Sequence, residues 1–218
     1  MARYVAPEFD ILTAFSAACA AQRINGEYLK QDVNLYDDAG SFIRADKIAN
    51  KILMTNILCD TTGITDADRE QAGLVIKHCQ GISFKLIMGK SLSDFEQVML
   101  RLADQQTVSS KYDLAVIASL PATYERSQVR HEIDVRLRQA NGILDCAINT
   151  KIEEEIEVVR CNYSNAWSTF YVTGLTASEN VVFFAFRSQL EVGSKINIKG
   201  KIKAHKENRT QLSHVKVK

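Results

Sequence analysis

Apolar residues recur at helical spacing through the first 150 residues of the chain. Phe95, Val98, Met99 and Leu102 show the pattern, in which positions three and four apart share one face of a helix. The polar run Ser91–Asp94 precedes them and supplies side chains that cap a helix start. The same spacing predicts further helices over residues 7–24, 41–60, 66–80 and 124–141.

The segment 111–121 is ambiguous. Its apolar run, Leu114–Leu120, ends at Pro121, and a proline disfavours helical backbone in the residue before it. The segment is therefore either a buried strand or the end of a helix. The stretch 124–139 alternates Arg, Glu and Asp with apolar positions, which is typical of an amphipathic helix. Its charges are expected to form ion pairs along the helix, with contacts to a phosphate backbone as the alternative.

Short strands replace helices after residue 150. Five runs rich in β-branched and aromatic residues follow one another, separated by turn-forming Asn, Ser and Gly. The runs are Ile152–Asn162, Trp167–Leu175, Val181–Arg187, Lys195–Ala204 and Thr210–Lys218. Their spacing predicts a small all-β barrel or sandwich.

The fourth run alternates most clearly. Ile196, Ile198, Gly200 and Ile202 face one way, because successive side chains of a strand point to opposite faces. The residues between them form a row facing the other way, made of Lys195, Asn197, Lys199, Lys201 and Lys203. One face is thus expected to be core and the other a row of lysines.

This change of pattern predicts an α+β fold of two domains. Residues 1–148 are expected to form a mostly helical domain, and residues 149–218 a small five-stranded β-barrel. A chain of 218 residues with 46% hydrophobic and 24% charged content can bury a core, which argues against disorder.

Charge is unevenly distributed along the chain. The total is +1, from 27 basic and 26 acidic residues, so the whole protein is no general polyanion binder. Residues 1–150 carry a net charge of −3 and residues 151–218 a net charge of +4. From Lys195 onward, eight basic residues face the single acid Glu207. The near-neutral total conceals a basic C-terminal region.

The sequence also indicates the cellular compartment in which the protein is expected. It has no run of about 18 apolar residues, so no membrane span or membrane partner is expected. Glu8 and Asp10 precede the apolar stretch Ile11–Ala21 where a secretory signal needs positive charge. The five cysteines form no CxxC pair, which does not resemble a disulfide framework or a zinc site. We expect a protein of the reducing cytoplasm.

The segment Leu190–Lys203 resembles the fourth strand of oligonucleotide-binding (OB) folds. In those folds a turn of the form hydrophobic-x-x-Gly leads into a strand with a central glycine and basic residues. Here Gly193 is the glycine of the turn and Gly200 is the central glycine of the strand. The resemblance covers about 68 of the 218 residues and implies an OB-like barrel closed by Thr210–Lys218. The helix common between the third and fourth strands is missing or reduced to Ser188–Val192.

The resemblance implies a nucleic-acid groove across strands two and three and the loops that join strand one to strand two and strand four to strand five. Such grooves stack bases on aromatic rings while cations follow the phosphates. Trp167 and Tyr171 share a mixed polar and aromatic face of strand two, and Phe183 shares a face of strand three with Arg187. The candidate nucleic-acid-binding residues are Trp167, Tyr171, Phe183, Arg187, Lys199, Lys201, Lys203, Lys206 and Arg209.

Each of these signals has a structural alternative. An aromatic residue in a small β domain belongs to the core more often than to a binding surface. The lysines of strand four could protect an exposed sheet edge from pairing. His205 and His214 flank the last loop, but without a Cys or acidic partner at ligand spacing we expect no metal site and interpret them as surface or stacking residues.

Enzyme motifs are absent from the sequence. Met88–Ser91 matches the end of a P-loop, but the glycine that the loop requires five positions before Gly89 is Phe84. The acids at 153–157 could hold Mg²⁺, yet strand alternation points Glu154 away from its neighbours, which favours a solvated acidic face. We expect no catalytic activity and no cofactor.

These observations predict a non-catalytic protein that binds single-stranded nucleic acid, DNA rather than RNA, in replication, recombination or transcription. The N-terminal domain would dock another protein or self-associate. In the alternative hypothesis, the β domain is a protein-interaction or assembly module that binds no nucleic acid. A third possibility is an enzyme built on residues 1–150. The few prolines and sparse motifs would suit a phage protein.

Overall fold

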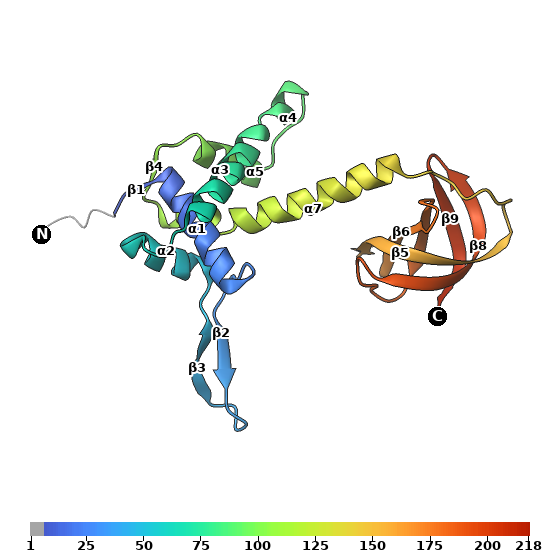
Figure 1. Ribbon diagram of the computed structural model, residues 1–218, viewed down its shortest axis with the longest axis horizontal. Coiled ribbons are helices and arrows are strands. Elements are labelled where there is room, and N and C mark those ends of the chain that lie inside the picture. Colours follow the sequence, from blue (N-terminus) through green and yellow to red (C-terminus); the bar gives the residue numbers. More distant parts are fainter. Residues whose placement is uncertain (1–6) are drawn as a thin grey trace, which may run out of the picture. The chain divides into compact units, whose positions relative to one another are not determined.

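The computed structural model describes residues 7–218 and shows the α+β architecture that the sequence predicts (Figure 1). The chain divides into two compact units, Met1–Gln128 and Val129–Lys218. Helices build the first unit and a closed β-barrel builds the second. Among the described residues, none of the helices combines the length and apolar character that crossing a membrane requires.

The helices of the N-terminal unit assemble around one Ala-rich helix. They are α1 (Ile11–Asn25), α2 (Asn50–Asp60), α3 (Asp66–Gly81), the short α4 (Phe84–Ile87), α5 (Asp94–Ala103), α6 (Lys111–Ile117) and the first part of α7 (Leu120–Gln139). Every residue of α1 from Ala14 to Gln22 is buried, and α2 and α3 pack against it. Small side chains allow this close approach. The two-residue strands β1 (Phe9–Asp10) and β4 (Thr107–Val108) pair beside it.

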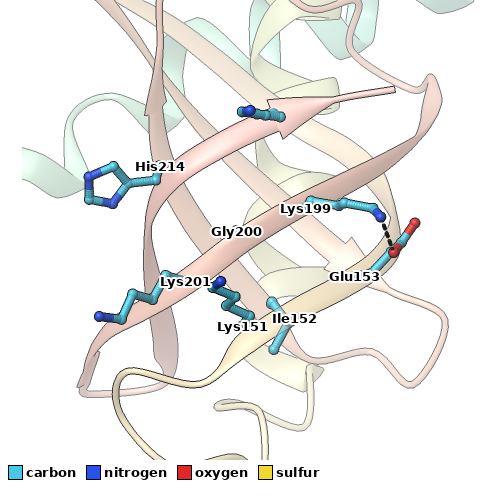
Figure 2. A pocket seen from close by; sticks show the side chains of 8 residues that line it. Lys151, Ile152, Glu153, Lys199, Gly200, Lys201 and His214 are labelled. Carbon is cyan, nitrogen blue, oxygen red and sulfur yellow. Dashed lines mark ion pairs between the residues drawn. The ribbon is translucent and has the colours of Figure 1, made fainter.

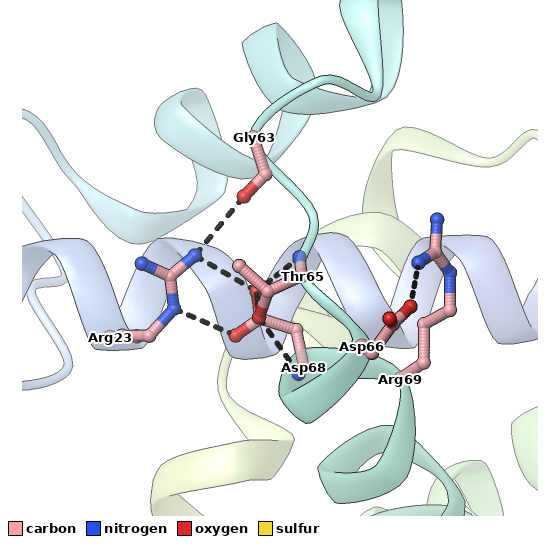
Figure 3. Close-up of polar contacts among 6 residues, drawn as sticks. All are labelled: Arg23, Gly63, Thr65, Asp66, Asp68 and Arg69. Carbon is pink, nitrogen blue, oxygen red and sulfur yellow. Dashed lines mark hydrogen bonds and ion pairs between the residues drawn. The ribbon is translucent and has the colours of Figure 1, made fainter.

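Polar caps set where these helices begin. Thr65 and Asp68 form a reciprocal capping box at the start of α3, and Ser93 and Glu96 form another at the start of α5. Asp68 is buried and also receives hydrogen bonds from Arg23 of α1, with Nε–Oδ1 and Nη2–Oδ2 distances of 2.9 and 2.8 Å (Figure 3). Its carboxylate therefore joins a helix start to a neighbouring helix.

The prediction of one helix over residues 41–60 is wrong in its first third. Strands β2 (Val33–Tyr36) and β3 (Phe42–Lys47) form an antiparallel hairpin before α2 begins at Asn50. Asp37 accepts backbone hydrogen bonds across the turn, and Gly40 has a φ of 80°. A turn with a left-handed glycine between β-branched and aromatic residues favours a hairpin over a helix.

Residues 111–121, which the sequence left open between a strand and a helix end, are helical. The segment contains α6 and the start of α7. Pro121 is the second residue of α7, within the first turn, where the amide that proline lacks has no partner inside the helix.

The second unit confirms the five predicted strands. They are β5 (Lys151–Ser164), β6 (Thr169–Thr176), β7 (Val181–Phe186), β8 (Lys195–Lys206) and β9 (Arg209–Val217). The barrel closes in the order β5-β6-β7-β9-β8, with β5 paired to both β6 and β8 and with β7 parallel to β9. This topology is consistent with an OB-like barrel. No helix separates β7 from β8.

Alternating side chains of the five strands fill the barrel. Ile198 and Ile202 of β8 are fully buried with Val172 and Phe184, as the alternation predicts. Gly174 lies where β6 packs tightly against β5, since an added Cβ would lie 2.6 Å from Ile156 Cδ1. These contacts fix which residues of β6, β7 and β8 must face solvent.

The second half of α7 packs on the outside of the same barrel. Ile133 and Leu137 contact a small cluster of Val159, Leu175 and Val181. Beside them Arg136 pairs with Glu157 at 2.7 Å and with Glu179 at 3.2 Å, and Arg160 pairs with Asp134. The charged face of this helix thus forms ion pairs, but with residues of the barrel region rather than along the helix as expected. Arg136 lowers the pKa of the Glu157 carboxyl through these hydrogen bonds.

Candidate nucleic-acid interface

Two aromatic rings lie side by side on the outer face of β6 and β7. Tyr171 of β6 and Phe183 of β7 are stacked, with ring centroids 5.7 Å apart and an interplanar angle of 9°. Both are half-buried, while Val172 and Phe184, their neighbours along the chain, are buried inside the barrel. Alternation therefore places Tyr171 and Phe183 outside, where the resemblance expected them.

A cation from a third strand completes this group. The guanidinium carbon of Arg209 lies 4.7 Å from the centroid of the Phe183 ring. Arg209 begins β9, and parallel pairing of Phe183 with Gln211 brings the start of that strand to β7. A guanidinium over an aromatic face is held by the ring quadrupole. We call Tyr171, Phe183 and Arg209 the aromatic surface.

Other predicted residues lie next to the aromatic surface along the chain. Trp167 is in the turn before β6 rather than in the strand, because Ser168 takes a left-handed φ of 44°. Its side chain is 74% exposed. Arg187 directly follows β7 and is exposed, and Lys206 pairs across the β8–β9 hairpin with Arg209. The two loops that the resemblance named therefore carry Trp167 and the pair Lys206 and Arg209.

The remaining lysines lie on different strands from the two rings. Lys199, Lys201 and Lys203 belong to β8, which pairs with β5 and β9 and with neither β6 nor β7. Since β8 has a partner on both sides, the alternative that its lysines protect a sheet edge is wrong. The structure thus separates the nine predicted residues into the aromatic surface with its neighbours and the lysines of β8.

Lys199 and Lys201 of β8 border a surface groove of about 530 Å³ over β5, β8 and β9 (Figure 2), and the predicted Lys203 is not among its lining residues. Its charged lining residues are Lys151, Glu153, Lys199, Lys201 and Lys216, and the imidazole of His214 also lines it. Sequence reasoning missed Lys151 and Lys216, which reach the groove through strand register. Lys151 lies opposite Lys201, and Lys216 lies opposite Lys199. We call these six residues the basic groove.

Glu153 is the acid in this lining. Its Oε2 lies 2.7 Å from Nζ of Lys199, and its other carboxylate oxygen pairs with Lys218. The hydrogen bonds from Lys199 and then Lys218 lower the pKa of Glu153, and the same contact raises the pKa of Lys199. The acidic run at 153–157 is therefore engaged with cations, at Glu153 here and at Glu157 beside α7.

The two histidines of the last hairpin have different roles. His205 Nε2 lies 2.8 Å from the carbonyl oxygen of Cys146, and its Nδ1 lies 3.0 Å from the hydroxyl of the buried Thr210. His205 is thus a structural link to the chain before the barrel. His214 has a φ of 53° in an irregular part of the β8–β9 pairing and points into the basic groove. Within residues 7–218, no three metal-ligating side chains are grouped to hold an ion.

No protein-family model matches this chain, and the searches of curated proteins and of solved structures likewise gave no match.

Proposed function

We propose that this protein is a non-catalytic binder of single-stranded nucleic acid and that its aromatic surface is the contact site. The observation that carries the proposal is the outward-facing stack of Tyr171 and Phe183 on the second and third strands of the barrel, with Arg209 over one ring. Bases of a single strand stack on such rings whatever their sequence, at about 1–3 kcal/mol per base.

A single-strand site also needs cations that neutralise the phosphates, and basic residues next to the aromatic surface supply them. Lys206 lies opposite Arg209 at the hairpin between β8 and β9. Arg187 follows the last residue of β7 and is exposed. Neither Lys206, Arg187 nor Arg209 forms an ion pair with another described residue. Their charges are therefore available to phosphates. A protein of this kind acts where strands are separated, in replication, recombination or transcription, and DNA is the form we propose.

Fluorescence anisotropy with a labelled oligothymidine tests this proposal. Replacing both Tyr171 and Phe183 by Ala removes two stacking rings and should weaken binding at least tenfold. Tyr112→Ala is the matched control, because Tyr112 is an exposed tyrosine on α6 in the other unit. It should leave the affinity unchanged.

The alternative of a protein-interaction module predicts a different result. In that case the wild-type protein would show no salt-sensitive binding to oligothymidine or oligouridine, which would contradict the proposal. Equal loss of binding in the Tyr112→Ala control would contradict the assignment of the site.

A further inference from the structure

The basic groove places like charges directly opposite one another. Lys151 of β5 faces Lys201 of β8, and Lys199 of β8 faces Lys216 of β9. Directly opposed like charges destabilise an antiparallel pair. Two such pairs side by side concentrate positive potential over three neighbouring strands.

This charge is only partly neutralised within the protein. Glu153 is bound by Lys199 and Lys218, whereas Lys151, Lys201 and Lys216 pair with no acid among residues 7–218. Figure 2 shows Lys201 and His214 projecting to one side of the groove and Lys199 turned toward Glu153 at the other. The groove is therefore suited to a ligand with several negative charges.

The lining of the groove indicates which part of a nucleic acid it can contact. Ile152 and Gly200 are its apolar lining residues, and none of the described residues that line it is a Phe, Tyr or Trp. A ligand here meets ammonium groups and the single imidazole of His214, but none of the larger rings on which successive bases of a single strand stack. A duplex presents phosphates and keeps its bases stacked inside, so it fits this chemistry better than a single strand does.

We propose that the basic groove binds the phosphate backbone of a nucleic-acid duplex, and that the protein prefers a junction between duplex and single strand. The preference for a junction rests on the proposed function, because the single-stranded arm would occupy the aromatic surface. The two surfaces lie on different strands of one barrel, β6 and β7 for the rings and β5, β8 and β9 for the lysines. The strands of the two surfaces are neighbours in the barrel, β6 beside β5 and β7 beside β9, and this is the path that a junction would follow.

The test compares three DNA probes with the full-length protein over a salt series. The probes are an oligothymidine of about 15 nucleotides, within the range one OB fold covers, a blunt duplex, and that duplex carrying an oligothymidine overhang. The variant is the double substitution Lys201→Gln and Lys216→Gln. The matched control is Lys51→Gln with Lys111→Gln, two exposed lysines on helices of the other unit.

The groove variant should weaken duplex binding about tenfold at low salt. Its plot of log K against log salt should be shallower by about 1.8, because two phosphate contacts are lost at about 0.9 each. Oligothymidine affinity should stay within about twofold of wild type. The overhang probe should bind wild type more tightly than either simple probe and lose that advantage in the variant.

Three results would overturn the inference, namely no duplex binding by the wild type, an unchanged salt slope in the groove variant, or equal losses on duplex and oligothymidine. The Tyr171→Ala and Phe183→Ala double variant separates this inference from the proposed function. If that variant keeps full oligothymidine affinity while the groove variant loses duplex binding, the single-strand proposal fails and the duplex assignment of the groove stands. Unchanged thermal unfolding of the groove variant confirms that folding does not explain its loss.

Discussion

At the scale of single residues, one position along a strand decides whether a side chain is core or contact surface. Phe183 and Phe184 are adjacent and chemically identical, yet Phe184 is buried in the barrel while Phe183 lies outside under Arg209. The alternative that an aromatic residue here belongs to the core is therefore true of Phe184 and not of Phe183. Burial follows from pleat and register rather than from residue type.

Trp167 gives a direct optical readout at this scale. It is the single tryptophan of the chain and is 74% exposed in the β5–β6 turn. We expect red-shifted emission that acrylamide quenches readily in the free protein, with strong protection once saturating oligothymidine stacks nearby. Strong quencher protection in the free protein would contradict the exposed placement.

The cysteines provide a second residue-scale test. All five are free thiols; Cys59 and Cys146 are exposed, whereas Cys19 and Cys79 are buried. Burial is the main cause that raises the pKa of both Cys19 and Cys79 to about 12, so neither has a thiolate at neutral pH. Iodoacetamide at pH 8 followed by mass spectrometry should modify Cys59 and Cys146 and leave Cys19 and Cys79 unreacted. Rapid modification of Cys79 in folded protein would contradict the helical packing.

At the scale of elements, close contacts between neighbouring strands constrain the barrel. Gly174 of β6 has no room for a side chain, because an added Cβ would lie 2.6 Å from Ile156 Cδ1 and 3.2 Å from the Glu157 carbonyl oxygen. Gly174→Ala should lower the free energy of unfolding by about 1–3 kcal/mol, the cost of overpacking a filled core. Chemical denaturation followed by far-ultraviolet circular dichroism measures this.

Gly73 on α3 is the matched control for that substitution. An added Cβ there meets no atom within 4 Å, and the position is inside a helix. Gly73→Ala should therefore stabilise the N-terminal unit by up to about 1 kcal/mol, since alanine is the better helix former. Equal destabilisation by both substitutions would contradict the tight approach of β6 to β5.

The hydrogen bonds between Arg23 of α1 and Asp68 of α3 predict how the stability of the fold depends on pH. Burial of Asp68 favours its neutral form, but hydrogen bonds from Arg23 and Thr65 outweigh this and hold the carboxyl pKa below its usual value. A lowered folded-state pKa contributes stability above the unfolded-state pKa of about 3.9, and that contribution is lost as the pH falls through the folded value. Wild-type stability should therefore fall below about pH 4.

Asp68→Asn tests that link. It removes the charge from the hydrogen bonds with Arg23 and should cost about 1–3 kcal/mol at pH 7, which thermal unfolding monitored by circular dichroism measures. The variant should lose less stability than wild type between pH 5 and pH 3. An identical pH profile in both proteins would exclude Asp68 as the titrating group.

At the scale of the whole molecule, the C-terminal unit includes the second half of α7. Ile133 and Leu137 cover Val159, Leu175 and Val181, and Arg136 pairs with two glutamates of the barrel region. The segment between helix and barrel contributes as well, since Leu144 belongs to the barrel core and its amide donates to the hydroxyl of the buried Thr210 at 2.9 Å. The barrel strands alone are therefore an incomplete unit.

Two fragments test where this unit begins. Residues 129–218 should fold with a cooperative transition and bind oligothymidine as the full chain does. Residues 149–218 lack the helix and Leu144, and should lose about 3 kcal/mol or more from the exposed apolar side chains. Comparable stability of the two fragments, measured by urea denaturation, would contradict a structural role for α7 in this unit.

Most of the long helices, the five strands and the facing of their side chains could be derived from the sequence because each depends on short-range periodicity. Ile198 and Ile202 inside β8, and Tyr171 and Phe183 outside β6 and β7, follow from a repeat of two along a strand. The hairpin at 33–47 was missed because its strands are only four and six residues long and bury no apolar face, so their pattern is too short to separate from that of a helix.

Only the tertiary structure decided which surfaces the charged residues share. Sequence alone grouped the lysines of β8 with the rings of β6 and β7, whereas barrel closure pairs β8 with β5 and β9 and places Lys199 and Lys201 among Lys151 and Lys216. Strand order and register join residues dozens of positions apart, and no local pattern encodes that pairing. Local periodicity thus determines what each strand presents, and closure of the barrel determines what lies beside it.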